Sequence, residues 1–283
     1  MRWTPGGRSR NLEDRRADGG GGLRRGVPLG LGGIVLLFVL SAVTGQNFFS
    51  LLEPGADQAV VPSGGGSVPA SSLPEEKQVE FVSFVLDDAQ ETWAKLLPGR
   101  YRETQLVLFR DAIDSACGFA QAATGPFYCP GDRKVYIDLT FYDELKRRFG
   151  AAGDFAEAYV LAHELGHHVQ TLLGIEPHVR RLQQGNPSQA NALSVRLELQ
   201  ADCFAGVWGH STERRNILER GDVEEALNAA ASIGDDRIQR LSAGRVHPES
   251  FTHGSSEQRV EWFRRGFDSG DPDECDTFGT GSK

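Results

Sequence analysis

Apolar residues recur at helical spacing along most of the chain beyond residue 75. Between residues 75 and 97 they lie three or four positions apart, which predicts an amphipathic helix that ends before Pro98. The same spacing predicts a mainly helical C-terminal half. The further helices that we expect cover residues 141–149, 155–173, 195–208, 222–241 and 255–267.

Two short runs have the β-branched and aromatic composition that strands prefer. They cover residues 105–109 and 134–138, and a loop over residues 118–132 separates them. Together with the helices, these runs predict an α+β fold, a mainly helical domain around a small antiparallel sheet.

Residues 27–52 contain no charged side chain and are dominated by Leu, Val, Gly, Phe and Ile. A membrane-spanning helix needs about 20 apolar residues, so this stretch predicts a transmembrane signal anchor. Residues 1–26 carry seven Arg against three acidic residues, which predicts a cytoplasmic N-terminus and an extracytoplasmic chain after residue 52. The alternative is a signal peptide cleaved near residues 41–43, but the apolar run continues past that site.

The remaining chain divides into a linker and one domain. Residues 53–75 are rich in Pro, Gly and Ser, so we expect a flexible linker, and residues 76–283 suffice for a single domain with a full core. Beyond residue 26 the chain has 23 basic and 36 acidic residues, a net charge of −13. An acidic domain without a basic stripe argues against nucleic acid as a partner. The oligomeric state is open.

All four cysteines lie beyond the apolar segment, at Cys117, Cys129, Cys203 and Cys275. An even number in an oxidising compartment predicts two disulfides, for which three pairings exist. Cys117 and Cys129 flank a short loop that a disulfide would close, which leaves Cys203 to hold the C-terminal tail at Cys275. Zinc ligation by cysteine is the alternative, but the paired C-x-x-C spacing of such sites is missing.

The clearest chemical signal is the H-E-x-x-H sequence His163-Glu164-Leu165-Gly166-His167, inside the predicted helix over residues 155–173. Residues four apart lie on one face of a helix, about 6 Å apart along its axis. Both imidazoles can therefore bind one metal ion. Glu164 projects beside them, within reach of a water at that ion, which is the pattern of zinc hydrolases.

Glu198 and Asp202 form a second signal, in the predicted helix over residues 195–208. They lie four apart on a face otherwise surrounded by apolar residues, without a Lys or Arg partner nearby on that face. Buried carboxylates are costly unless they hold a cation or a hydrogen-bond donor. We interpret Glu198 as the third zinc ligand, and Asp202 as the acceptor for the second ring N–H of a ligating histidine. Two carboxylates satisfied without any metal are the alternative.

Other zinc classes and other histidines fit less well. A metzincin needs Gly and His where Gln170 and Leu173 stand, and a Met-turn, whereas Met1 is the only methionine. The remaining histidines outside the final loop are interpreted as surface residues. They are His168, His178, His210 and His247.

Four sequence segments, in this order along the chain, resemble the bacterial putative neutral zinc metallopeptidase family (the YpfJ-like group) and its gluzincin-type site. They are GPFYCP (125–130), AYVLAHELGHHVQ (158–170), ELQADC (198–203) and THGSSEQR (252–259). The resemblance covers almost the whole chain, including the Arg-rich start. It implies a membrane-tethered zinc peptidase with a reduced gluzincin domain, and it does not imply a physiological substrate.

The function that we expect is therefore peptide-bond hydrolysis with one zinc ion, held by His163, His167 and Glu198, and with Glu164 as general base. Partners are a protein or peptide substrate and the lipid bilayer. A strand at residues 134–138 is the candidate for binding substrate backbone by strand addition, or it is an ordinary core strand. The alternatives are a zinc amidase that acts on cell-envelope material and a non-catalytic, membrane-tethered zinc-binding scaffold.

His253 is a further candidate, in the loop before the last predicted helix. Gly254 frees the backbone there to approach another segment, and a histidine from a distant loop can stabilise the oxyanion of a zinc hydrolase. Arg259, near the start of that helix, helps in this role or pairs with an acidic residue. The alternative for His253 is an exposed or loop-capping side chain.

Overall fold

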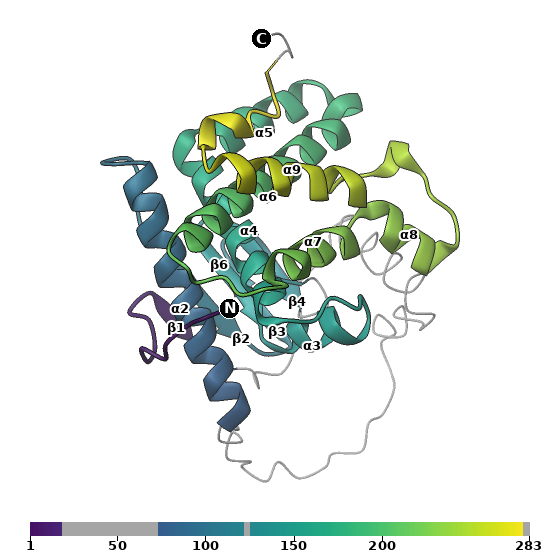
Figure 1. Cartoon of the computed structure of the whole chain (residues 1–283). Helices are drawn as coiled ribbons and strands as arrows, with labels where there is room; N and C mark the ends of the chain where they lie inside the picture. The colour runs from purple at the N-terminus through teal and green to yellow at the C-terminus, as the bar shows by residue number, and fades with distance from the viewer. Residues whose placement is uncertain (19–72, 122–124, 280–283) are drawn as a thin grey trace, which may run out of the picture.

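The computed structural model describes residues 1–18, 73–121 and 125–279. In Figure 1, α4 runs through the centre of the molecule, with α2 along one side, α6 and α9 above it, and α7 beside it. The described helices are α2 (Leu73–Leu96), α3 (Thr140–Arg147), α4 (Asp154–Leu173), α5 (Ile175–Gly185), α6 (Ala190–Arg214), α7 (Asp222–Ser232), α8 (Asp235–Ala243) and α9 (Ser256–Ser269). Three 3-10 turns are η3 (Pro187–Gln189), η4 (Pro248–Ser250) and η5 (Pro272–Cys275).

The predicted helices are present, with two differences. The range 222–241 is broken into α7 and α8 at Gly234, where an added Cβ would lie 2.4 Å from the backbone nitrogen of Ser256. The chain breaks there because α9 begins against it. The polar segment after α4 contains an unpredicted helix, α5, which starts after the left-handed Gly174.

The strands are β1 (Leu12–Asp14), β2 (Gln105–Phe109), β3 (Ala112–Ser115), β4 (Gly118–Gln121), β5 (Phe127–Cys129) and β6 (Lys134–Asp138). A four-stranded sheet has the order β1-β2-β6-β5, and β3 and β4 form a separate hairpin. The antiparallel prediction is wrong for the two predicted strands, because β2 and β6 pair in parallel and only β5 pairs antiparallel to β6. The cause is the intervening loop, whose hairpin and β5 form the crossover that parallel pairing requires.

The main core lies between this sheet and α4. Val82 and Leu86 of α2, Leu106 of β2 and Ile137 of β6 belong to one buried apolar cluster, together with the apolar side chains of α4. Burial of this apolar surface fixes α4 rigidly in the domain, and α6, α7 and α9 cover its other sides. The helix with the H-E-x-x-H sequence is thus the central element of the fold.

Residues 1–18 pack against the same domain. The strand β1 adds to β2 in parallel, and Trp3 contacts Phe81 of α2, with ring centroids 5.3 Å apart. The ammonium group of Met1 lies 2.7 Å from Asp154 and 3.2 Å from Asp222. The sequence prediction, which places residues 1–26 in the cytoplasm, does not include this packing of residues 1–18 against the domain.

Both expected disulfide pairings are present, Cys117–Cys129 between the β3–β4 turn and β5, and Cys203–Cys275 between α6 and η5. All four cysteines are therefore bonded, which removes cysteine as a zinc ligand. No helix in the described part of the chain is long and apolar enough to cross a membrane. The expected anchor at residues 27–52 and nearly all of the linker at 53–75 lie outside the described residues.

Candidate metal centre

The centre is built where α4 and α6 pack closely. Gly166, inside the H-E-x-x-H sequence, faces Ala201 of α6, and a Cβ added to Gly166 would lie 3.0 Å from the carbonyl oxygen of Ala201. A larger residue would hold the two helices apart. This close approach brings Glu198 of α6 against the histidines of α4.

Three side chains converge at this contact, as expected from the sequence. The Nε2 atoms of His163 and His167 lie 3.2 Å and 3.6 Å from the carboxylate oxygens of Glu198. One donor atom from each of the three residues lies within 4.8 Å of the other two. Two imidazole nitrogens and a carboxylate oxygen are the donor set of catalytic zinc sites, which leave a further position open.

The other ring nitrogen of each histidine has an acceptor, which suits this donor set. His163 donates from Nδ1 to Asp202 at 2.8 Å, and His167 donates from Nδ1 to the Gln170 side chain at 2.9 Å. Gln170 is itself fixed, because its amide donates to the Leu197 carbonyl of α6 at 2.7 Å. Both Nε2 atoms are thereby left to face Glu198 and a cation.

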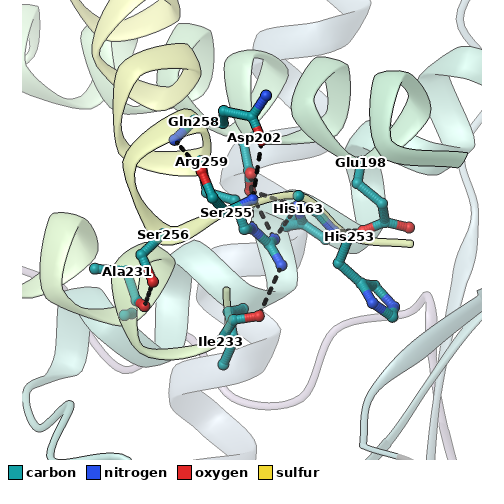
Figure 2. A network of polar contacts seen from close by, with 12 residues as sticks. His163, Glu198, Asp202, Ala231, Ile233, His253, Ser255, Ser256, Gln258 and Arg259 are labelled. Atoms are coloured by element: carbon teal, nitrogen blue, oxygen red, sulfur yellow. Dashed lines mark hydrogen bonds and ion pairs between the residues drawn. The ribbon is translucent and has the colours of Figure 1, made fainter. Parts of the chain in front are cut away.

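Asp202 is fully buried and connects three helices. Besides His163, it accepts a hydrogen bond from the Tyr159 hydroxyl at 2.5 Å. It also accepts two from Arg259 of α9, at 2.8 Å and 2.9 Å, and Figure 2 shows Arg259 beside Asp202. A buried arginine that binds a carboxylate through two nitrogens is held in a fixed geometry. Of the two alternatives for Arg259, the structure shows the pairing with an acidic residue, and that residue is the one that orients His163.

These contacts shift the proton affinities of the centre. Burial alone would raise the pKa of Glu198, but the neighbouring His167 and His163 outweigh it and hold this pKa below its usual range. Burial opposes protonation of His163, yet the carboxylate of Asp202 raises the pKa of that imidazole to about 10. Without a metal ion, the two carboxylates therefore favour a proton on His163, and a metal ion that binds to this imidazole would displace that proton.

Glu164 lies on α4 beside the ligand set and is buried. Within the part of the chain that the structure describes, its carboxylate takes part in no hydrogen bond or ion pair, unlike those of Glu198 and Asp202. The three carboxylates thus differ in environment. Glu198 faces both imidazoles, and Asp202 accepts four hydrogen bonds. The carboxylate of Glu164 can interact with a bound molecule.

His253 lies at the edge of this centre, with its ring near Glu198 in Figure 2. The loop reaches this place because Gly254 has a φ of +91°, and a Cβ there would lie 3.2 Å from Leu199 of α6. Asp235 fixes the loop by accepting the backbone N–H groups of Thr252, His253 and Gly254 at 2.7, 2.6 and 3.1 Å.

Asp235 also orients the imidazole, since its second oxygen lies 3.2 Å from Nδ1 of His253. This hydrogen bond raises the pKa of His253, so the ring keeps its proton to higher pH than a free histidine. The side chain of His253 is 52% exposed and can reach a bound molecule. Its exposure fits the expected role as well as the alternative of an exposed side chain.

One of the other histidines differs from the prediction. His168 is not a surface residue: it is 1% exposed, donates from Nε2 to the Arg102 carbonyl at 2.6 Å, and accepts from the Tyr128 hydroxyl at 3.1 Å. Burial lowers its pKa, and it ties α4 to β5. His178 and His247 are exposed and His210 is partly buried, and all three lie outside the ligand set.

Sequence reasoning missed four residues of the centre: Gly166, Gln170, Tyr159 and Asp235. Gln170 follows His167 by three positions on one helix, a spacing that predicts contact and was the available signal. Tyr159 likewise precedes His163 by four positions. Asp235 gave no such signal, because only the fold brings it to a loop 18 residues further along the chain.

An H-E-x-x-H helix packed against a second helix that supplies a glutamate is the arrangement of zinc metallopeptidases. The family profile described as "Putative neutral zinc metallopeptidase" matches residues 1–278, and the chain belongs to this family. The matched range includes the arm as well as both helices of the centre.

The chain is similar to proteins whose own functions are not described. It is 52% identical to the uncharacterized protein YpfJ of Escherichia coli K12 over 99% of both chains. It is also 47% identical to the uncharacterized protein Rv2575 of Mycobacterium tuberculosis over 66% of each chain. No solved structure matches.

Proposed function

We propose that the protein is a zinc-dependent metallopeptidase that hydrolyses peptide bonds. The observation that carries the proposal is the set of three donor atoms from His163, His167 and Glu198, within 4.8 Å of one another and beside the unpaired Glu164. The family membership supports the same activity. One zinc ion held by these three residues is part of the proposal.

Bound zinc would supply the Lewis acid that activates water and polarises the scissile carbonyl. The protein's own residues do the rest. Glu164 accepts a proton from the attacking water and delivers it to the leaving amine. His253, held with its proton by Asp235, donates a hydrogen bond to the oxyanion that develops on the scissile carbonyl.

Binding of a substrate backbone by strand addition needs a strand at the edge of a sheet, with unpaired N–H and C=O groups. The expected strand at residues 134–138 is not at an edge. In the structure this strand is β6, and it pairs with β2 on one side and β5 on the other. It is therefore the ordinary core strand of our alternative. We assign strand addition to β5 instead, the sheet edge next to α4, where Tyr128 hydrogen-bonds to His168.

The test separates metal binding from chemistry. In the full-length chain, purified in detergent, we expect Glu164→Gln to keep stoichiometric zinc and to lose nearly all cleavage of an unfolded protein substrate. Glu198→Ala should lose the zinc itself, because it removes one of three ligands. Metal analysis and peptide release on the same samples measure both.

The outcomes distinguish the other functions. Equal zinc loss in both variants would refute the division of roles between the two carboxylates. If the unmodified protein binds stoichiometric zinc but cleaves no protein substrate, the zinc-binding scaffold is favoured. Glu164-dependent cleavage of cell-envelope amides, with none of proteins, would favour the zinc amidase.

For localisation, we propose that residues 27–52 tether the protein to a membrane and that the domain works outside the cytoplasm. The length and apolar character of this segment support the tether. The two disulfides support the compartment, because cytosolic thiols are mostly kept reduced.

A further inference from the structure

The N-terminal arm, residues 1–18, is bound as an integral strand of the sheet. The strand β1 pairs in parallel with β2, in the register Leu12 to Leu106 and Asp14 to Leu108. At its ends, Leu106 donates to the Asn11 carbonyl at 2.8 Å, and Arg15 donates to the Leu108 carbonyl at 2.8 Å. Backbone pairing of this kind covers the edge of β2, which would otherwise expose unpaired groups.

The arginines of the arm pair with acidic residues of the domain. Arg10 lies 2.8 Å from Glu103, two residues before β2, and Arg8 lies 2.8 Å from Glu76 of α2. Arg16 is 6% exposed and binds Asp14 through two nitrogens, at 2.8 Å and 2.6 Å. Asp14 belongs to the arm itself, and Arg16 also reaches the domain, where it lies 2.8 Å from Glu75 of α2. A buried guanidinium is costly unless it is paired, so these two carboxylates stabilise Arg16 at this position. The arginine excess that suggested a cytoplasmic location is thus used in docking.

The arm ends where α2 begins. The guanidinium of Arg16, near the last described residue of the arm, lies 2.8 Å from Glu75 in the first turn of α2. The points at which the chain leaves the described structure after residue 18 and returns at residue 73 are therefore bridged by one side chain. Whatever path residues 19–72 take, they leave from and return to one region of the domain surface.

We propose that residues 1–18 and 73–279 form one folded unit on a single side of the membrane. A membrane cannot separate β1 from β2, since their backbones are hydrogen-bonded. This inference does not depend on the proposed peptidase activity.

The test is cross-linking and labelling of the full-length chain in native membranes. The variant carries Arg10→Cys and Glu103→Cys, two exposed positions whose ion pair contributes little to stability. The four native cysteines are bonded and do not react with maleimides. A short bismaleimide should join the two new cysteines within one chain in most molecules. In the control pair, Arg10→Cys with Glu249→Cys, the second site lies in η4 between α8 and α9, on the far side from β1 in Figure 1, and little cross-link should form.

Membrane-impermeant maleimide, applied to each single-cysteine variant in intact and in opened cells, identifies the side. We expect the cysteines at positions 10 and 103 to become labelled under the same condition. Labelling of position 10 only from the opposite side to position 103 would overturn the proposal. So would the lack of a cross-link in protein whose disulfides and zinc content are normal.

Discussion

At the residue scale, Asp202 links three helices, since His163, Tyr159 and Arg259 all donate to its two oxygens. Its carboxylate balances a buried guanidinium as well as orienting a proposed zinc ligand. Removal of one partner from such a pair leaves an uncompensated charge, at a cost of about 3–5 kcal/mol. Substitutions there must therefore separate a loss of folding from a loss of zinc.

We predict that Asp202→Asn weakens zinc binding by about 10–100-fold, because the amide is a poorer acceptor for His163 and presents a donor towards Arg259. Arg259→Lys keeps the charge but not the two-nitrogen contact, and should have a smaller effect in the same direction. Competition with a chelator, far below the melting temperature, measures the affinity. An unchanged affinity together with a lower melting temperature would make Asp202 purely structural.

His253 gives a prediction with a pH dependence. His253→Ala should lower kcat by about 10²–10³-fold, the loss for one oxyanion donor, with zinc content and KM little changed. Asp235→Asn removes the charge that raises the pKa of His253, so the protonated ring is lost at lower pH. The alkaline limb of the kcat profile should then move to lower pH.

The matched control for Asp235→Asn is Glu249→Gln, which removes the carboxylate that pairs with the exposed His247 at 3.3 Å. It should leave the profile unchanged. Full activity of His253→Ala would remove this histidine from the mechanism and return it to the role of an exposed loop residue.

At the scale of elements, the contact of α4 with α6 decides the geometry of the centre. Gly166→Ala would place a methyl group 3.0 Å from the Ala201 carbonyl oxygen and 3.1 Å from its Cα atom. We expect a stability loss of about 1–3 kcal/mol, and weaker zinc binding because Glu198 moves with α6. Denaturant unfolding and chelator competition measure the two effects.

Gly185→Ala is the control, since the Cβ that it adds to the end of α5 meets no atom within 4 Å. It should cost neither stability nor zinc affinity. Normal zinc affinity in Gly166→Ala would mean that the ligand set tolerates a change in helix spacing.

The sequence predicts the helices better than the sheet, for a physical reason. Because one face of each of α2, α4 and α6 is buried, apolar residues recur in them at helical spacing. This spacing can be read from the sequence of each segment alone. The strand β1, by contrast, has only three residues among charged neighbours and forms because β2 offers an edge. The parallel pairing of β2 with β6 likewise follows from the crossover between them and not from either strand alone.

The same distinction applies to the centre. His163, Glu164 and His167 share one helix turn, and their proximity follows from helix geometry. The position of Glu198 relative to them depends on how closely α6 packs, which Gly166 determines. The pairing of Asp235 with His253 depends on a loop that only the folded chain forms. His168 was misjudged because its partners, Arg102 and Tyr128, lie in distant segments.

At the scale of the whole molecule, the N-terminal arm resembles a ligand that is covalently attached to its own binding site. The ion pair between Arg16 and Glu75 lies where the arm ends and α2 begins. Because the arm and its site belong to one chain, docking of the arm does not depend on protein concentration, which is an advantage over a separate peptide. A single proteolytic cut within residues 19–72 would remove that advantage without touching any contact of the fold. The arm would then bind by mass action, and the stability of the zinc-binding domain would fall on dilution.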